Sequence, residues 1–322
     1  MLPAVWRSTR LTKRFLCNNG WLSAHKLFYS TDNNEKIRSV RRDALMSLNY
    51  HLDHVDNDVP EAVVKHPGLS YADYDSNGQP KIWMIMKILE SVRFFAHHVP
   101  LDSTGRTFRD YEQVTRDCLI FLVTSEFVLS KEIYKPSQLT TWMRTSIKGG
   151  YVGKSSLNSL TEMRSENGEK FLASNINHVV CVGKQSRRPM SFPLWWREKY
   201  SESGKKHQPL NLKRFDKPDG ASVYNTNIAW SDTDANLHTN WTSYARFAVD
   251  AAHHCHQNGA LENFEDNFSN GIHKVQIYFY GESVQGDKLT VHTWQDKSDH
   301  RILMMDIYNK EKSICQIKLF FH

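Results

Sequence analysis

The carboxy-terminal third of the chain alternates between apolar and polar residues in runs that predict β-strands. These runs cover 221–230, 272–284, 288–297, 301–309 and 313–322. The turn sequences YGES, QGD and NKEK separate the later runs. After the first run, apolar residues recur at helical spacing: Tyr244, Phe247, Ala248, Ala251 and Cys255. The pattern predicts one long helix with a curved antiparallel sheet wrapped around it.

The first half of the chain carries a weaker copy of this pattern. Segments 71–91, 138–142 and 167–180 resemble, in that order, segments 230–250, 288–294 and 309–322. The alignment sets Asp73, Asp75 and Asn77 opposite Asp232, Asp234 and Asn236, and sets Gln79 and Lys81 opposite His238 and Asn240. Repetition of elements in one order indicates an internal duplication. Because polar residues of the second copy are replaced in the first, we expect the first copy to be degenerate.

The composition is that of a globular protein with a sizeable core. The 322 residues are 40% hydrophobic and 24% charged. No stretch approaches the ~20 apolar residues that a membrane span needs. The net charge is +6, but five positive charges lie in residues 1–31, which leaves +1 for the rest. A nucleic-acid partner therefore has little support, because it would require a basic surface on the folded part.

Residues 1–31 are typical of a mitochondrial transit peptide. The segment contains Arg and Lys residues, no acidic residue, and apolar side chains between the cations. It lacks the continuous apolar core of a secretory signal. We therefore expect a leader over 1–31 and a location in the mitochondrial matrix.

The sequence predicts neither a metal nor a cofactor. The cysteines are scattered and never spaced as C-x-x-C: Cys17, Cys118, Cys181, Cys255 and Cys315. In HHCHQ, His253 and His256 could share one helical face, but no carboxylate or cysteine pair accompanies them. At the end of a helix such imidazoles interact favourably with the helix dipole.

The polar cluster WSDTDANLHTN, residues 230–240, has two simple explanations. It begins like a calcium loop, but the twelfth position is Ser243, and Met84 in the first copy, where such a loop needs a bidentate Glu. Asn240 is also a good N-cap for a helix that starts at Trp241. A cap does not explain Asp234 and His238.

The order of these elements resembles the hot-dog fold thioesterases. The motif W-x-D-T-D-A-x-x-H-x-N lies between a strand and a helix, and YGESVQGDKL follows on the next strand. Small acyl-CoA thioesterases of the 4-hydroxybenzoyl-CoA thioesterase type carry a similar D-T-D-A before the helix. The D-x-N-x-H-x-N run of plant acyl-ACP thioesterases is similar to Asp234, Asn236, His238 and Asn240.

This resemblance implies an α+β fold of two tandem hot-dog domains, each a long helix wrapped by a curved antiparallel sheet. We expect a first, degenerate domain over 60–195, a linker over 196–218, and a second domain with the catalytic motif over 219–322. Two chains could pair further into a homodimer, since hot-dog sheets often extend or pack across an interface.

The resemblance also implies that the protein releases a fatty acid from acyl-ACP or acyl-CoA. Asp234 would act as base or nucleophile. Asn236 and His238 would position the water and the thioester, and backbone N–H groups around Thr239 to Trp241 would polarise its carbonyl. The expected substrate-binding residues are Asp232, which would also shape the loop, Thr239, Asn240 and Trp241.

The chain departs from the plant enzymes on the strand after the helix. Where they carry Glu and Cys, this sequence has Tyr278 and Phe279. The departure leaves open a hot-dog protein that binds acyl carrier protein or lipid without hydrolysis. An enoyl-thioester hydratase is a further alternative, although its D-x-N-P-x-H motif has a proline and one residue more than the run from Asp234 to His238. A hydratase would form a 3-hydroxyacyl thioester, whereas a thioesterase releases a free thiol.

Overall fold

The computed structural model describes residues 42–135, 141–186, 188–205, 207–234 and 236–322, without the side chains of residues 203, 265 and 266. The expected leader, residues 1–31, lies outside this part, as do residues 138–140 of the expected repeat. No helix within the described ranges is both long and apolar enough to cross a membrane.

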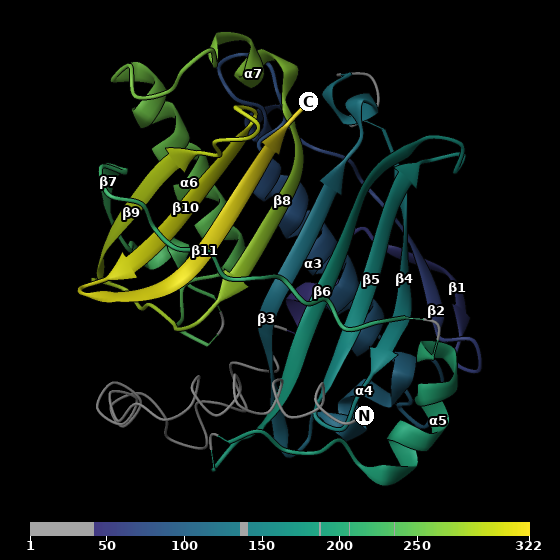
Figure 1. Cartoon of the computed structure of the whole chain (residues 1–322). Coiled ribbons are helices and arrows are strands. Elements are labelled where there is room, and N and C mark those ends of the chain that lie inside the picture. The colour runs from purple at the N-terminus through teal and green to yellow at the C-terminus, as the bar shows by residue number, and fades with distance from the viewer. Residues whose placement is uncertain (1–41, 136–140, 187, 206, 235) are drawn as a thin grey trace.

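In the described part of the chain, eleven strands form one antiparallel sheet (Figure 1). The first half supplies β1 (His51–Asp56), β2 (Glu61–His66), β3 (Cys118–Leu129), β4 (Met143–Val152), β5 (Ser156–Ser165) and β6 (Phe171–Gly183). The second half supplies β7 (Ser222–Asn227), β8 (Ile272–Phe279), β9 (Lys288–Gln295), β10 (Ile302–Asn309) and β11 (Lys312–Phe321). The strands predicted for the second half are thus confirmed; β7 to β10 are shorter than predicted, and β11 is shifted by one residue.

The sheet contains two groups of strands in mirror order. Outward from the middle, β3-β6-β5-β4-β2 on one side matches β8-β11-β10-β9-β7 on the other. In each group the strand after the long helix lies at the middle, and the strand before the helix lies farther out. β1, which precedes residue 60, extends the first group at its edge. The duplication seen in the sequence therefore corresponds to a pseudo-twofold arrangement of strands.

Two long helices, α3 (Ile82–His98) and α6 (Trp241–Gln257), pack against each other on one face of the sheet (Figure 1). The apolar residues that predicted α6 are all buried: Tyr244, Phe247, Ala248, Ala251 and Cys255. Further helices in the described residues are 42–46, α4 (Tyr111–Val114), α5 (Leu194–Gly204) and α7 (Glu265–Asn270), with 3-10 turns η3 (Tyr71–Asp73), η4 (Phe108–Asp110), η5 (Lys131–Tyr134) and η7 (Trp230–Asp232).

The two halves are joined through β3 and β8. Their pairing sets Phe127 opposite Val275, and both side chains are buried in a core that includes residues of both long helices. Gln276 donates a hydrogen bond of 2.6 Å to Glu126 across the same pair of strands. One sheet and one core therefore continue through both halves.

Part of the segment expected as a linker, 196–218, is helical. Helix α5 packs on β4 and buries Trp196 and Tyr200. The following extended chain crosses the sheet on the face opposite the long helices (Figure 1). There the Thr124 hydroxyl donates to the main-chain oxygen of Leu210. The sequence did not predict α5, because most of its residues are polar and its buried side consists of few aromatic residues.

Candidate active site

The polar cluster before α6 forms a compact loop. After the turn η7, Thr233 and Thr239 pair as a short β-bridge. Inside the bridge, the Asp234 N–H donates to the main-chain oxygen of His238 (2.8 Å), and the Leu237 N–H donates to that of Asp234 (3.0 Å). Leu237 has a φ of 63°, which is uncommon for a residue other than glycine. These bonds place Asp234 and His238 side by side, just before the start of α6.

The Asp234 carboxylate is half-buried in this loop. Its Oδ1 accepts a hydrogen bond of 2.6 Å from the N–H of Asn236. The side chain of Asn236 itself is exposed on the loop. Asn236 therefore fixes the orientation of Asp234 through its backbone, where the sequence suggested a role for its side chain.

His238 faces a carboxylate that the sequence did not single out. Its Nε2 lies 3.4 Å from Oε2 of Glu282, in the YGES turn after β8. The two side chains are only 14% and 20% exposed. The His238 backbone pairs with Val284 beyond the same turn, and this pairing sets the imidazole against Glu282. A carboxylate in this position can orient an imidazole ring and select its tautomer.

The two residues that the sequence comparison aligned with the Glu and Cys of the plant enzymes lie on opposite faces of β8, and only Phe279 belongs to the core around the long helices. Tyr278 and Phe279 are buried, and the Phe279 ring packs edge-on against Tyr244 at 5.4 Å between centroids. Glu282 is a different carboxylate, in the turn after the strand. The YGES motif that contains Glu282 was recognised in the sequence, but only the path of the turn places Glu282 next to His238.

Within the described residues, one of the three expected N–H donors at the start of α6 has no hydrogen-bond partner. The Thr239 N–H donates to the main-chain oxygen of Ser283 (2.8 Å), and the Asn240 N–H to that of Asp232 (2.7 Å). The remaining donor is the N–H of Trp241. The expectation of a shared set of donors is therefore corrected, because the first two hold the loop together.

A buried hydroxyl network ties the loop to the YGES turn. The Thr239 and Tyr244 hydroxyls lie 2.7 Å and 2.9 Å from the hydroxyl of Ser283. Burial raises the pKa of Tyr244 well above its ordinary value, so its hydroxyl stays neutral. Thr239 thus has a structural role here, and its expected contact with substrate stays a prediction.

Asp232 is also engaged within the protein. It is 5% exposed, accepts a hydrogen bond of 2.9 Å from the N–H of Ala229, and pairs with Arg246 of α6. These contacts give Asp232 a part in the shape of the loop, as the sequence suggested, and its expected contact with substrate stays a prediction.

The start of α6 contacts helix α3 of the first half. Asn240 caps α6, because its Oδ1 accepts from the N–H of Thr242 at 2.8 Å. Its Nδ2 donates to Glu90 of α3 (3.1 Å), and the indole of Trp241 donates to the same carboxylate (2.9 Å). The predicted cap is confirmed. Glu90 escaped notice because it lies 150 residues away in the other copy.

Comparison with known proteins gives matches among solved structures. No protein-family model matches the sequence, and no curated protein matches it. A protein assigned as an oleoyl thioesterase from Lactobacillus plantarum has a TM-score of 0.62 and 14% identity, over 82% of this chain and 97% of its own. The 12:0-ACP thioesterase from Umbellularia californica has a TM-score of 0.59 and 13% identity, over 81% and 97%. An acyl-ACP thioesterase from Bacteroides thetaiotaomicron has a TM-score of 0.60 and 14% identity, over 83% and 100%.

The chain has the double hot-dog fold. The expected class, two tandem hot-dog domains in which a long helix is wrapped by a curved antiparallel sheet, is confirmed. At such low identity the likeness shows the fold alone. The chemistry has to be judged from the site itself.

The first hot-dog domain repeats the backbone of the loop. The Asp75 N–H donates to the main-chain oxygen of Gln79 (2.8 Å), as Asp234 does to His238. Asp75 Oδ1 also accepts from the N–H of Asn77 (2.8 Å). The side chains differ, since Gln79 donates to the main chain of α7 instead of facing a carboxylate. The loop geometry is thus duplicated, while the imidazole is not.

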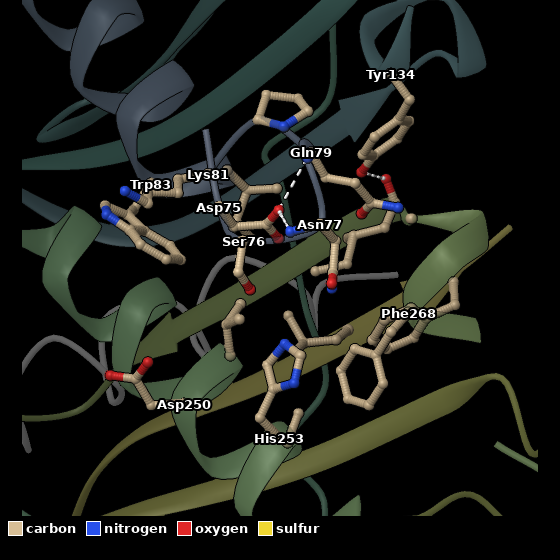
Figure 2. A pocket seen from close by; sticks show the side chains of 18 residues that line it. Asp75, Ser76, Asn77, Gln79, Lys81, Trp83, Tyr134, Asp250, His253 and Phe268 are labelled. Carbon is tan, nitrogen blue, oxygen red and sulfur yellow. Dashed lines mark hydrogen bonds between the residues drawn. The ribbon is translucent and has the colours of Figure 1, made fainter. Parts of the chain in front are cut away.

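A cavity of about 270 Å³ lies beside this first loop (Figure 2). Asp75 and Asn77 lie on one side of it, and His253 and Phe268 on the other. His253 stacks on Phe268 at 4.0 Å between ring centroids, and burial lowers the pKa of His253. Across the described ranges, no group of three His, Cys, Asp or Glu side chains is arranged to hold a metal ion. Both His253 and His256 contact the ring of Phe268, so the HHCHQ segment contributes ring packing at the end of α6.

Proposed function

We propose that this double hot-dog protein is an acyl thioester hydrolase that releases a fatty acid from acyl-ACP or acyl-CoA. The observation that carries the proposal is the position of the Asp234 carboxylate beside the start of α6, where the Trp241 N–H has no partner in the described chain. Such a carboxylate can take a proton from water, and an N–H at a helix start can donate to a developing oxyanion. The thioesterases with a similar fold support this class of substrate.

In this mechanism water attacks the carbonyl carbon of the thioester. Asp234 accepts a proton from the water as the C–O bond forms, and the Trp241 N–H donates to the oxygen that becomes negative. The C–S bond then breaks with its electron pair on sulfur, and the proton on Asp234 passes to the thiolate. Attack by Asp234 itself, through an anhydride that water opens, has the same net balance. His238, oriented by Glu282, holds the water or the carbonyl in place.

The test is thiol release by the full chain from a panel of acyl-CoA and acyl-ACP substrates. We expect Asp234→Asn to lose about 10²–10⁴-fold in kcat, the range that general-base catalysis contributes. Asp75→Asn is the matched control, because it changes the same turn in the first domain and should keep the wild-type rate. Wild-type turnover in Asp234→Asn would refute the assignment.

A non-catalytic acyl-binding protein is the second candidate. It is favoured by the buried Tyr278 and Phe279 at the positions where the plant enzymes carry Glu and Cys. Binding of acyl-ACP with no thiol release from any substrate would support it. A 3-hydroxyacyl product from an enoyl thioester would indicate the hydratase instead.

A further inference from the structure

Helix α3 of the first domain reaches the site of the second domain through one charged side chain, Glu90. We propose that Glu90 is a positioning residue of the hydrolytic site, which holds Asn240 and Trp241 and thereby fixes the Trp241 N–H relative to Asp234. This inference rests on the proposed function and assigns a part of it to the degenerate first domain.

Both oxygens of Glu90 are used by the start of α6. Oε2 accepts from the Asn240 amide at 3.1 Å, and Oε1 accepts from the Trp241 indole at 2.9 Å. Hydrogen bonds to a carboxylate are stronger than those between neutral groups. Because the two donors belong to consecutive residues, the carboxylate fixes two side chains of one helical turn against α3.

This contact is connected to the catalytic loop through Asn240. The same side chain that donates to Glu90 also caps α6 through Thr242, so its rotation would break both interactions. The Asn240 N–H donates to Asp232, at the base of the loop that carries Asp234. The next N–H along the chain is that of Trp241, the donor assigned to the oxyanion. Small displacements of such a donor reduce catalysis strongly.

The charge of Glu90 also acts on Asp234. Burial raises the pKa of Glu90, Arg93 and the two hydrogen bonds lower it, and the charge of Asp234 raises it. Repulsion between two carboxylates is mutual, so a charged Glu90 opposes ionisation of Asp234. The other ionisable groups around the loop are His238, Glu282, Asp232 with its partner Arg246, and Arg93 on α3, and none of them is altered when only Glu90 is replaced.

The internal duplication gives an independent comparison. In the alignment of 71–91 with 230–250, Glu90 corresponds to Val249 on α6. Val249 lines the cavity beside the first-domain loop. The second domain therefore presents an apolar side chain to that loop, at the position where α3 has Glu90. Of the two positions that this alignment relates, only Glu90 carries a carboxylate, and it contacts the start of α6, next to the loop that carries His238.

The first experiment compares Glu90→Gln with the wild-type full chain in thiol release. Gln has the same size, but its amide nitrogen cannot accept a hydrogen bond, so one of the two bonds from Asn240 and Trp241 is lost. We therefore expect kcat to fall about tenfold or more. The acid limb of the kcat/KM profile should move to lower pH, because the repulsion of Asp234 is gone. A purely structural role would lower stability without moving that limb. Glu162→Gln, which removes a surface carboxylate on β5, is the control.

Wild-type kcat together with an unmoved acid limb in Glu90→Gln would overturn the proposal. A second measurement does not need turnover, and it follows the indole N–H of Trp241 by NMR, assigned through Trp241→Phe. We expect this signal to titrate with Glu90, to lose that titration in Glu90→Gln, and to titrate at lower pH in Asp234→Asn. A signal indifferent to Glu90→Gln would also overturn the proposal. If no thioester is hydrolysed but the signal follows Glu90, the hydrolase assignment fails and the contact between the domains stands.

Discussion

The pairing of His238 with Glu282 shows how one turn completes a site. The imidazole lies at the neck of the Asp234 loop, and the carboxylate approaches from the turn after β8. The two side chains face each other because the backbone of His238 pairs with that of Val284, next to the turn that carries Glu282. The two side chains therefore act as a unit.

We expect Glu282→Gln and His238→Ala each to lower kcat/KM by up to about 10²-fold, because the water and the carbonyl are then held less precisely. The double variant should lose little more than His238→Ala alone, because Glu282 acts through the imidazole. Steady-state thiol release from one acyl-CoA substrate measures this.

The control for this pair is Glu311→Gln, which alters an exposed carboxylate in the NKEK turn. It should leave kcat/KM unchanged. Losses that simply add in the double variant would contradict the idea that the two residues work together.

The pairing of strands β3 and β8 couples the unfolding of the two hot-dog units. Their pairing buries Phe127 against the shared core, at the middle of the sheet. The long helices meet on the same face of that sheet. Unfolding of one half would therefore expose apolar surface of the other, which favours a single cooperative transition.

Phe127→Ala should lower the free energy of unfolding by about 3–5 kcal/mol, because it leaves a cavity at the junction. Denaturant titration followed by far-UV circular dichroism measures this loss. Phe94→Ala is the matched control, since Phe94 of α3 is 41% exposed and should change stability by no more than about 0.5 kcal/mol. Two separate transitions in the wild-type chain would show that the halves unfold independently.

The molecule as a whole carries several histidines that are held neutral by burial. Burial lowers the pKa of His66 and His178 to about 4 and that of His97 to about 3. In the unfolded chain these groups bind protons near pH 6.5. Between these values the unfolded state therefore binds more protons than the folded state, and stability falls as the pH falls.

We expect the free energy of unfolding to decrease as the pH is lowered from 7 through 6.5 towards 4. Each such histidine contributes up to about 1.4 kcal/mol per pH unit within that window. Denaturant titrations at pH 7 and pH 5 measure the decrease. In His178→Gln the decrease should be smaller, because one proton fewer is taken up on unfolding. A stability that rises towards pH 5 would contradict this account.

The sequence determined much of the fold, because many of its signals are local. Helical spacing placed α6, alternation placed the strands of the second half, and Asn240 marked the start of α6. The repeated Asp loop was visible for the same reason, since its turn depends on residues close together in the chain. The candidate carboxylate Asp234 came from that motif.

Only the tertiary structure decided how the site is built. Glu282 and Glu90 reach the loop from another turn and another domain, and their partners follow from the path of the chain through space. The N–H groups of Thr239 and Asn240 are used by main-chain oxygens that no local pattern brings to them. Local periodicity fixes which residues form a helix or a strand, whereas contacts across the sheet fix which polar groups remain available for chemistry.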